Sequence, residues 1–220
     1  MSSGSLPDND LEAARLTMNP HIRNRYSIMQ RITLVYCLIR TKLLSPRARL
    51  IRFPFDLRGK KFVDFGRALT TGRYCRIEAF ATESDDKNIK IKFGNNVQIN
   101  DFVHISAIER IAIGDSVLMA SHIYISDNSH GSYKGDEYDS DPRIPPTRRQ
   151  YVTKPVSIGD NTWIGEGVMI LPGAMIGKGC VIGAHSVVSE GIYPDYSMIV
   201  GTPARIVKRY NTVSNRWEKI

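Results

Sequence analysis

The sequence predicts an all-β solenoid of about five triangular coils, and a six-residue period is the main reason. In the stretch VSIGDNTWIGEGVMILPGAMIGKGCVIGAHSVV, a large aliphatic residue returns at every sixth position, from Ile158 to Val188. Similar series begin earlier in the chain, at Phe65, Phe93 and Ile113. An α-helix repeats apolar residues every three or four positions and a strand every two, so a period of six indicates short strands separated by turns.

Three consecutive six-residue units supply enough chain for three short strands and three corners, which make one triangular coil. The series open with related motifs, VDFG, IKFG, IAIG and VSIG, and we expect their glycines to relieve the turn. Four positions after each large aliphatic residue we expect a second inward side chain. These residues are mostly small or β-branched, as a narrow core requires, and Cys75 and Cys180 are therefore interpreted as core residues. They are Leu69, Cys75, Ala81, Val97, Val103, Val117, Ile123, Thr162, Val168, Ala174, Cys180 and Ser186.

Three interruptions break the period. Residues 83–90 form a polar excursion, Glu109 and Arg110 form a short insertion, and residues 126–155 leave the pattern for well over one coil. The last segment is rich in Asp, Pro, Ser and Tyr. A long loop on a rigid scaffold often carries function, so this segment is a candidate part of a site.

The two ends of a solenoid need covers, because open sheet edges pair with other chains. We expect residues 9–45 to form one or two helices that cap the first coil, and the tail from 205 to 220 to cap the last. The chain is accordingly divided into a helical, basic segment 1–62, a solenoid 63–204 and a C-terminal cap 205–220. The apolar residues expected to face the first coil are Leu11, Leu16, Ile28, Ile32, Val35, Leu38 and Ile39.

The charge of the chain is unevenly distributed. Of 220 residues, 42% are hydrophobic and 24% charged, as in ordinary globular proteins. Residues 1–62 carry 12 Lys and Arg against 4 Asp and Glu, which accounts for the whole net charge of +8. The basic segment is therefore expected to have a partner of its own.

The apolar run ITLVYCLI lies within this basic segment and is too short to span a bilayer. Two interpretations remain open: a surface helix on anionic lipid, or a capping helix with a solvated basic face. No nucleic-acid-reading motif accompanies the charge, so nucleic acid is not an expected partner. The N-terminus does not resemble a signal peptide, and the three cysteines suit neither a zinc site nor a disulfide framework. We therefore expect a cytoplasmic protein, located peripherally at the inner membrane face if the helix binds lipid.

At this point the motifs resemble those of the hexapeptide-repeat acyltransferases. The resemblance rests on the repeats together with SDNSHG, IGDNTWIGEGV, IGAHSVV and VGTPARIVKR, and it covers about residues 63–210. Within that family the sequence is most similar to galactoside and maltose acetyltransferases and to O-acetyltransferases of bacterial surface-polysaccharide synthesis. The resemblance implies a left-handed β-helix, a homotrimer, acetyl-CoA bound between neighbouring subunits, no metal, and a saccharide or lipid-linked saccharide acceptor.

The resemblance also assigns roles to individual residues. His130 matches the catalytic histidine, which would remove the proton of the attacking hydroxyl. Asn100 matches an acceptor-binding asparagine. Asp127 is the second expected substrate-binding residue; it, or a nearby backbone carbonyl, would hold the tautomer of the imidazole, unless the Asp127 carboxylate binds local backbone instead. The matches to coenzyme-binding positions are Trp163, Ala184, Ser189, Arg205 and Lys208, and the two basic residues suit the coenzyme phosphates. Two acids, Glu166 and Glu190, depart from the galactoside pattern close to this anionic ligand.

Other functions stay compatible with the sequence. The acceptor is an amine in one alternative, such as an amino-sugar nucleotide. A second is a zinc hydratase similar to γ-type carbonic anhydrases, which would need His104, His122 and His130 to converge although their positions in the repeat differ. A third is a non-catalytic scaffold, which the VGTPARIVKR tail disfavours. Among the remaining histidines, His104 is the next candidate for a substrate contact, whereas His21 and His185 carry no assigned role.

Overall fold

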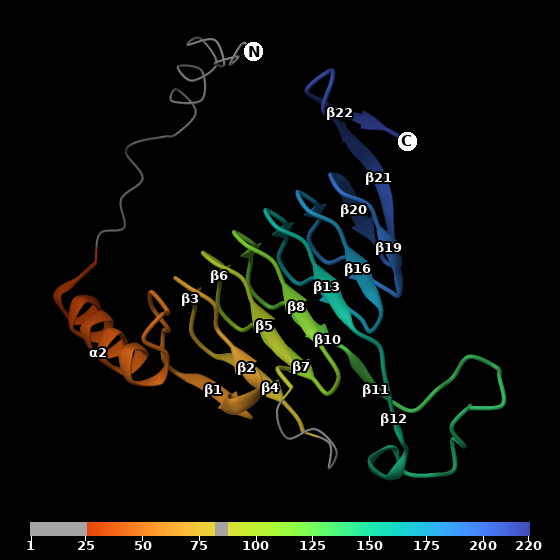
Figure 1. The fold of residues 1–220 in the computed structure, drawn as a ribbon, viewed down its shortest axis with the longest axis horizontal. Helices are drawn as coiled ribbons and strands as arrows, with labels where there is room; N and C mark the ends of the chain where they lie inside the picture. The colour runs from red at the N-terminus through yellow and green to blue at the C-terminus, as the bar shows by residue number, and fades with distance from the viewer. Residues whose placement is uncertain (1–25, 82–87) are drawn as a thin grey trace. The chain divides into compact units, whose positions relative to one another are not determined.

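The computed structural model of the chain describes residues 26–81 and 88–220. The chain divides into two compact units, Met1–Leu34 and Val35–Ile220, and every described strand belongs to the larger one (Figure 1). The described residues contain one α-helix, α2 (Ile28–Leu44), and two 3-10 helices, η1 (Lys60–Phe62) and η2 (Pro146–Arg148). His21 and the predicted apolar residues Leu11 and Leu16 lie outside the described residues.

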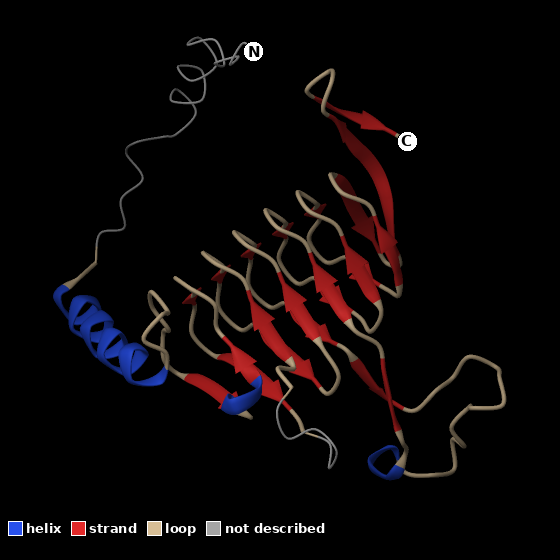
Figure 2. Cartoon of the chain, in the orientation of Figure 1, coloured by secondary structure: helices blue, strands red, loops and turns tan. Residues whose placement is uncertain are grey.

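The larger unit is a left-handed β-helix with three sheets as its sides (Figure 2). The first sheet has the order β1 (Phe55–Arg58), β4 (Cys75–Ala79), β7 (His104–Ala107), β10 (Tyr124–Ser126), β15 (Met169–Ile170) and β18 (Val187–Val188). The second has the order β19 (Gly191–Tyr193), β16 (Ala174–Ile176), β13 (Val156–Ile158), β8 (Ile111–Ile113), β5 (Ile91–Phe93) and β2 (Val63–Asp64). The third has the order β22 (Arg216–Lys219), β21 (Ala204–Asn211), β20 (Ser197–Gly201), β17 (Val181–Ile182), β14 (Trp163–Ile164), β9 (Leu118–Met119), β6 (Gln98–Ile99) and β3 (Thr70–Thr71). All neighbouring strands of these sheets are parallel except β20, β21 and β22, which pair antiparallel.

Five complete coils follow one another along the chain, beginning at β2, β5, β8, β13 and β16, which confirms the predicted number. Strand β1 joins the first sheet ahead of them, although it lies inside the segment 1–62 that was expected to be helical. After the last complete coil, β19 and β20 continue the second and third sheets. The C-terminal tail then forms an antiparallel hairpin that extends the third sheet.

The hexad positions form the core, as predicted. The large aliphatic residues from Ile158 to Val188 are all buried, and so are eleven of the twelve residues expected at the second inward position. Ala81 is the exception, because its side chain is exposed. Strand β4 continues in register with β7 as far as Ala79, which pairs with Ala107 and takes the inward position instead.

Three of the four motif glycines, Gly94, Gly114 and Gly159, have a different role from the one predicted, whereas Gly66, with φ 57°, has the left-handed backbone expected at a turn. Gly94 has no left-handed φ; the left-handed residue of that corner is Asn96, with φ 56°. A Cβ on Gly94 would lie 2.3 Å from the Asp115 carboxylate and 2.6 Å from the carbonyl carbon of Gly114 in the next coil. Stacked coils approach to the strand spacing, about 4.8 Å, and leave no room for a side chain there. Glycine at this position therefore permits close stacking of coils rather than the turn itself.

The C-terminal part of helix α2 belongs to the larger unit and makes polar contacts within it. Thr41 is buried, and its hydroxyl donates to the carbonyl of Cys37 and accepts the N–H of Ile51 at 2.8 Å. Of the apolar residues expected to cover the first coil, those that the structure describes are exposed instead, so the prediction is wrong for Ile28, Ile32, Val35, Leu38 and Ile39.

Candidate active site

A pocket of about 990 Å³ lies on the outer face of the first sheet. Its floor comes from the outward residues of β1, β4, β7 and β10, and one wall is an antiparallel ribbon of β11 (Asn128–His130) and β12 (Tyr151–Thr153). This ribbon belongs to the segment 126–155 that interrupts the repeats. The pocket is lined by Arg58, Arg76, Glu78, Phe80, Ala81, His104, Ser106, Ile108, Tyr124, Ser126, Asn128, Ser129, His130, Tyr151, Thr153, Leu171 and Pro172.

His130 is the last residue of β11 and pairs with Tyr151 across the ribbon. The two rings are in contact, with centroids 4.5 Å apart and planes inclined by 46°. The side chain is exposed in the pocket, and its ring nitrogens form no hydrogen bond with a described residue. The ribbon thus holds an imidazole at the pocket wall while leaving both nitrogens accessible.

Asp127 does not contact His130. It is fully buried, and its carboxylate accepts the backbone N–H groups of Ile108 at 2.9 Å, Glu109 at 2.8 Å and Arg110 at 2.6 Å. Two of these donors, Glu109 and Arg110, form the short insertion between the series that begin at Phe93 and Ile113. The geometry therefore supports the local-backbone alternative for Asp127 and not its expected place among the substrate-binding residues.

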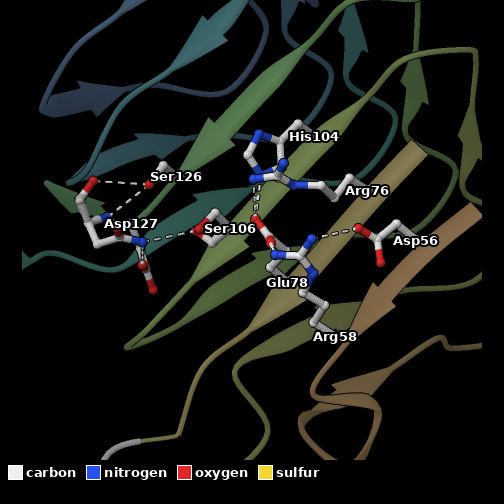
Figure 3. A network of polar contacts seen from close by, with 9 residues as sticks. Asp56, Arg58, Arg76, Glu78, His104, Ser106, Ser126 and Asp127 are labelled. Carbon is white, nitrogen blue, oxygen red and sulfur yellow. Dashed lines mark hydrogen bonds and ion pairs between the residues drawn. The ribbon is translucent and has the colours of Figure 1, made fainter. Parts of the chain in front are cut away.

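A buried carboxylate organises the pocket floor (Figure 3). Glu78 is only 2% exposed, and it forms an ion pair with Arg58 at 2.7 Å and with Arg76 at 2.8 Å. His104 Nε2 lies 2.8 Å from the same carboxylate. Burial alone would raise the pKa of Glu78, but hydrogen bonds from His104 and Arg76 together with their charge hold this pKa below its usual value. Glu78 is therefore ionised at neutral pH.

The remaining proposed site residues lie away from this pocket. Asn100 and Ala184 are exposed at corners between the third and first sheets, and Ser189 follows β18. Trp163 is half-exposed on β14 of the third sheet. Arg205 and Lys208 are on β21 of the same sheet, paired with β20. A single chain thus does not bring the expected coenzyme residues to His130.

The two acids that depart from the galactoside pattern have partners within the chain. His122 Nδ1 lies 2.8 Å from Glu166, and this hydrogen bond lowers the pKa of Glu166. Lys154 forms an ion pair with Glu190 and lowers the pKa of that carboxyl. Both charges are therefore at least partly compensated without a ligand.

The three histidines of the zinc alternative have separate surroundings. His104 contacts Glu78 on the first sheet, His122 stacks on Phe102 at a corner, and His130 lies on the ribbon. Within residues 26–81 and 88–220, no group of three His, Cys, Asp or Glu side chains is arranged to hold a metal ion.

Sequence analysis did not identify Arg58, Arg76 or Glu78. Their only signal was the alternation of polar and apolar residues in FDLR, the sequence of β1, and CRIEA, the sequence of β4, which marks an outward face. That pattern gives no indication of which polar residues meet across the strands.

Comparisons with known proteins identify the repeat. Residues 155–190 match the family model described as bacterial transferase hexapeptide, six repeats. WbbJ of Escherichia coli strain K12, provisionally named a lipopolysaccharide biosynthesis O-acetyl transferase, is 40% identical over 198 residues, or 90% of this chain and 97% of WbbJ. A provisionally named acetyltransferase of Mycobacterium tuberculosis strain H37Rv is 42% identical over 118 residues, or 54% of this chain and 37% of its own.

Two kinds of solved structure are similar. A variant of AntD, an N-acyltransferase from Bacillus cereus solved with dTDP and coenzyme A, gives a TM-score of 0.62 at 19% identity over 88% of this chain and 94% of its own. At that identity the match shows a common fold. A maltose O-acetyltransferase from Clostridium difficile 630 gives a TM-score of 0.50 at 26% identity over 83% of this chain and 89% of its own.

Proposed function

Because the chain belongs to the hexapeptide-repeat transferases, we propose that it transfers an acetyl group from acetyl-CoA to a saccharide hydroxyl in the synthesis of a bacterial surface polysaccharide. O-antigen, capsule and exopolysaccharide are all compatible acceptor classes. The observation that carries the proposal is the exposed imidazole of His130 on the wall of a large pocket, without a polar partner among the described residues.

The chemistry requires one proton acceptor. A saccharide hydroxyl is a weak nucleophile until its proton is removed, and imidazole is suited to that task near neutral pH. In the proposed reaction His130 accepts the hydroxyl proton as the oxygen bonds to the acyl carbon, and then returns a proton to the departing sulfur. Acetyl-CoA supplies the acetyl group as a thioester. No covalent acyl-enzyme is needed in this scheme.

The proposed coenzyme contacts suit an anionic, pantetheine-bearing ligand. Arg205 is exposed and Lys208 half-buried on β21, where cationic side chains would meet phosphate groups. Trp163 is exposed on the same sheet. We propose that Ala184 and Ser189 contact the pantetheine arm and that Asn100 binds the acceptor.

We also propose a homotrimer, since these residues lie outside the pocket of His130 within one chain. A neighbouring copy would supply them. Light scattering of active fractions should give three times the mass of the chain, and an active monomer would contradict this arrangement.

The test of the function is His130→Ala, assayed with acetyl-CoA and a panel of glycans. We expect kcat to fall roughly a hundredfold to ten-thousandfold, with little change in KM for acetyl-CoA or in Tm. His122→Ala is the matched control, because His122 is an exposed histidine outside the pocket. Retention of more than about a tenth of kcat in His130→Ala would refute the assignment. Transfer to amino sugars but not to hydroxyl acceptors would favour the N-acetyltransferase alternative.

We further propose that helix α2 brings the protein to an anionic membrane surface. Val35, Ile39 and Leu43 are exposed on successive turns of α2, between 56% and 79%. Residues 26–55 contain no Asp or Glu, whereas they include Arg40 and Lys42 beside these apolar residues. Among the described residues, no helix has the length and apolar character to cross a membrane. An apolar stripe with basic flanks suits an anionic bilayer surface.

Flotation with anionic and with uncharged vesicles tests this proposal. We expect salt-sensitive binding to anionic vesicles only, and loss of binding in Ile39→Glu. Equal recovery of the parent and Ile39→Glu with anionic vesicles would contradict it.

A further inference from the structure

The floor of the pocket contains a second histidine, and its contact with Glu78 fixes the tautomer of its neutral ring. Glu78 is ionised and has no proton to donate, so its 2.8 Å contact with His104 requires the proton to be on Nε2 of His104. In the neutral imidazole Nδ1 is then an acceptor, and no described residue donates to it. Arg76 Nε also lies 3.3 Å from His104 Nε2, a longer contact that the carboxylate outcompetes.

Arg76 supplies a hydrogen-bond donor on the neighbouring strand. Arg76 and His104 are paired in register on β4 and β7, so their side chains project from the same face of the first sheet. Arg76 uses Nη2 to bind Glu78, and its Nη1 has no partner among the described residues. Figure 3 shows Arg76 and His104 converging on the Glu78 carboxylate. The carboxylate thereby holds Arg76 and His104 in place. Each of them keeps one polar atom without a partner among the described residues, Nη1 of Arg76 and Nδ1 of His104.

This combination matches the chemistry of a neutral sugar hydroxyl, which donates one hydrogen bond and accepts others. The charges of the cluster balance, because Arg58 and Arg76 are offset by Glu78 and by Asp56, which pairs with Arg58 at 3.1 Å. The cluster therefore has no excess positive charge that would require an anionic ligand. Exposed aromatic rings complete the surroundings, with Phe80 and Tyr151 both lining the pocket. Aromatic faces pack well against the apolar face of a pyranose.

We propose that Arg76 and His104, held by Glu78, form an acceptor subsite that binds a non-reacting hydroxyl of the saccharide, with Nδ1 of His104 accepting a hydrogen bond from the hydroxyl and Arg76 Nη1 donating one to its oxygen. This inference rests on the proposed function, since it concerns the acceptor of the same pocket. It assigns substrate binding to residues outside the expected set, and it predicts an acceptor with at least two hydroxyls near each other. His104 binds and orients the acceptor, while His130 removes the proton.

Two substitutions of one residue separate this role from a structural one. His104→Gln places an amide near the position of Nε2, where it keeps a bond to Glu78, but removes the acceptor at Nδ1. His104→Asn places an amide near the position of Nδ1 and loses the bond to Glu78. A binding role makes His104→Gln the more harmful change for acceptor affinity, whereas a purely structural role makes His104→Asn the more harmful one.

The experiment has two readouts on the full chain. Saturation-transfer NMR with mono- and disaccharides measures acceptor binding without acetyl-CoA, and steady-state kinetics measures KM for the acceptor and for acetyl-CoA. We expect His104→Gln to weaken acceptor binding and raise its KM about threefold to tenfold, the effect of one lost hydrogen bond, with KM for acetyl-CoA unchanged. His104→Asn should retain more of the acceptor affinity than His104→Gln.

Equal acceptor binding by the parent and both variants would overturn the subsite, and so would the absence of saccharide binding by the parent. The proposed function fails separately, if saccharides bind but no acetyl transfer is detected. In that case the NMR comparison still decides the role of His104.

Discussion

Asp127→Ala is expected to lower the stability of the protein without abolishing the proposed acetyl transfer. The Asp127 carboxylate accepts three backbone N–H groups, from Ile108, Glu109 and Arg110, and a side-chain amide from Asn128 at 3.0 Å. A hydrogen bond to a charged group contributes about 1.5–3 kcal/mol. Glu109 and Arg110 are exposed, so water can replace the carboxylate at their N–H groups, whereas Ile108 is half-buried.

The loss should therefore be well below the sum of these four bonds, and we expect about 3 kcal/mol for Asp127→Ala. For a chain of this length that corresponds to a decrease in Tm of about 6–12 °C. Asp127→Asn keeps one acceptor oxygen and should lose less. Because Asp127 does not contact His130, kcat measured well below Tm should stay within about threefold of the parent.

Differential scanning calorimetry and steady-state kinetics on the same preparations test this reasoning. Asp115→Ala is the control, since Asp115 is exposed and accepts one backbone N–H, from Asn95 at 2.6 Å, and its effect on Tm should be smaller. An Asp127→Asn variant with an unchanged Tm but a hundredfold lower kcat would refute the structural role. It would instead indicate that Asp127 acts on the imidazole during the reaction.

Three further predictions concern the coils and their buried groups. Gly94→Ala should destabilise the protein by about 1–3 kcal/mol in urea titrations, because its Cβ would overlap the next coil; an unchanged transition would contradict the proposed close stacking. Since the folded-state pKa of Glu78 lies below its unfolded value of about 4.3, its contribution to stability should be present above that pH and decline as the pH falls toward the folded-state pKa. Glu78→Gln should reduce this loss of stability at acid pH. An unchanged dependence of stability on pH in the variant would refute the assignment of this loss to Glu78. Burial raises the pKa of Cys75 to about 11, so iodoacetamide at pH 8 should modify it only in the unfolded chain, as peptide mass spectrometry can show.

The position of His130 shows how far motif and structure agree. The motif SDNSHG identified the residue, and the structure places it in a pocket at the point where the repeats are interrupted. The antiparallel ribbon that holds it was not predicted. Its strands are three residues each, and the loop between them is long, so the sequence contains no recognisable hairpin pattern.

Helix α2 illustrates a different limit. The sequence predicted a helix in this region, and the structure contains one, but the face that packs was predicted incorrectly. Burial depends on what lies opposite the helix, and here a buried threonine hydroxyl bonds to the backbone of Ile51. The exposed stripe of Val35 and Ile39 could not be recognised from periodicity, because an amphipathic pattern does not state which partner covers the apolar face.

The sequence by itself determined the solenoid. Each six-residue unit specifies its own strand and corner through local preferences, and repetition of the unit makes neighbouring coils stack in register, so the core positions follow from the period alone. Only the tertiary structure decided what meets on the outer surface. Insertions of different length separate the coils, so the neighbours of Glu78 on adjacent strands lie at irregular distances along the chain. Polar side chains such as Arg58 and His104 become partners of Glu78 because coil stacking places their strands about 4.8 Å apart, a consequence of packing that no local pattern encodes.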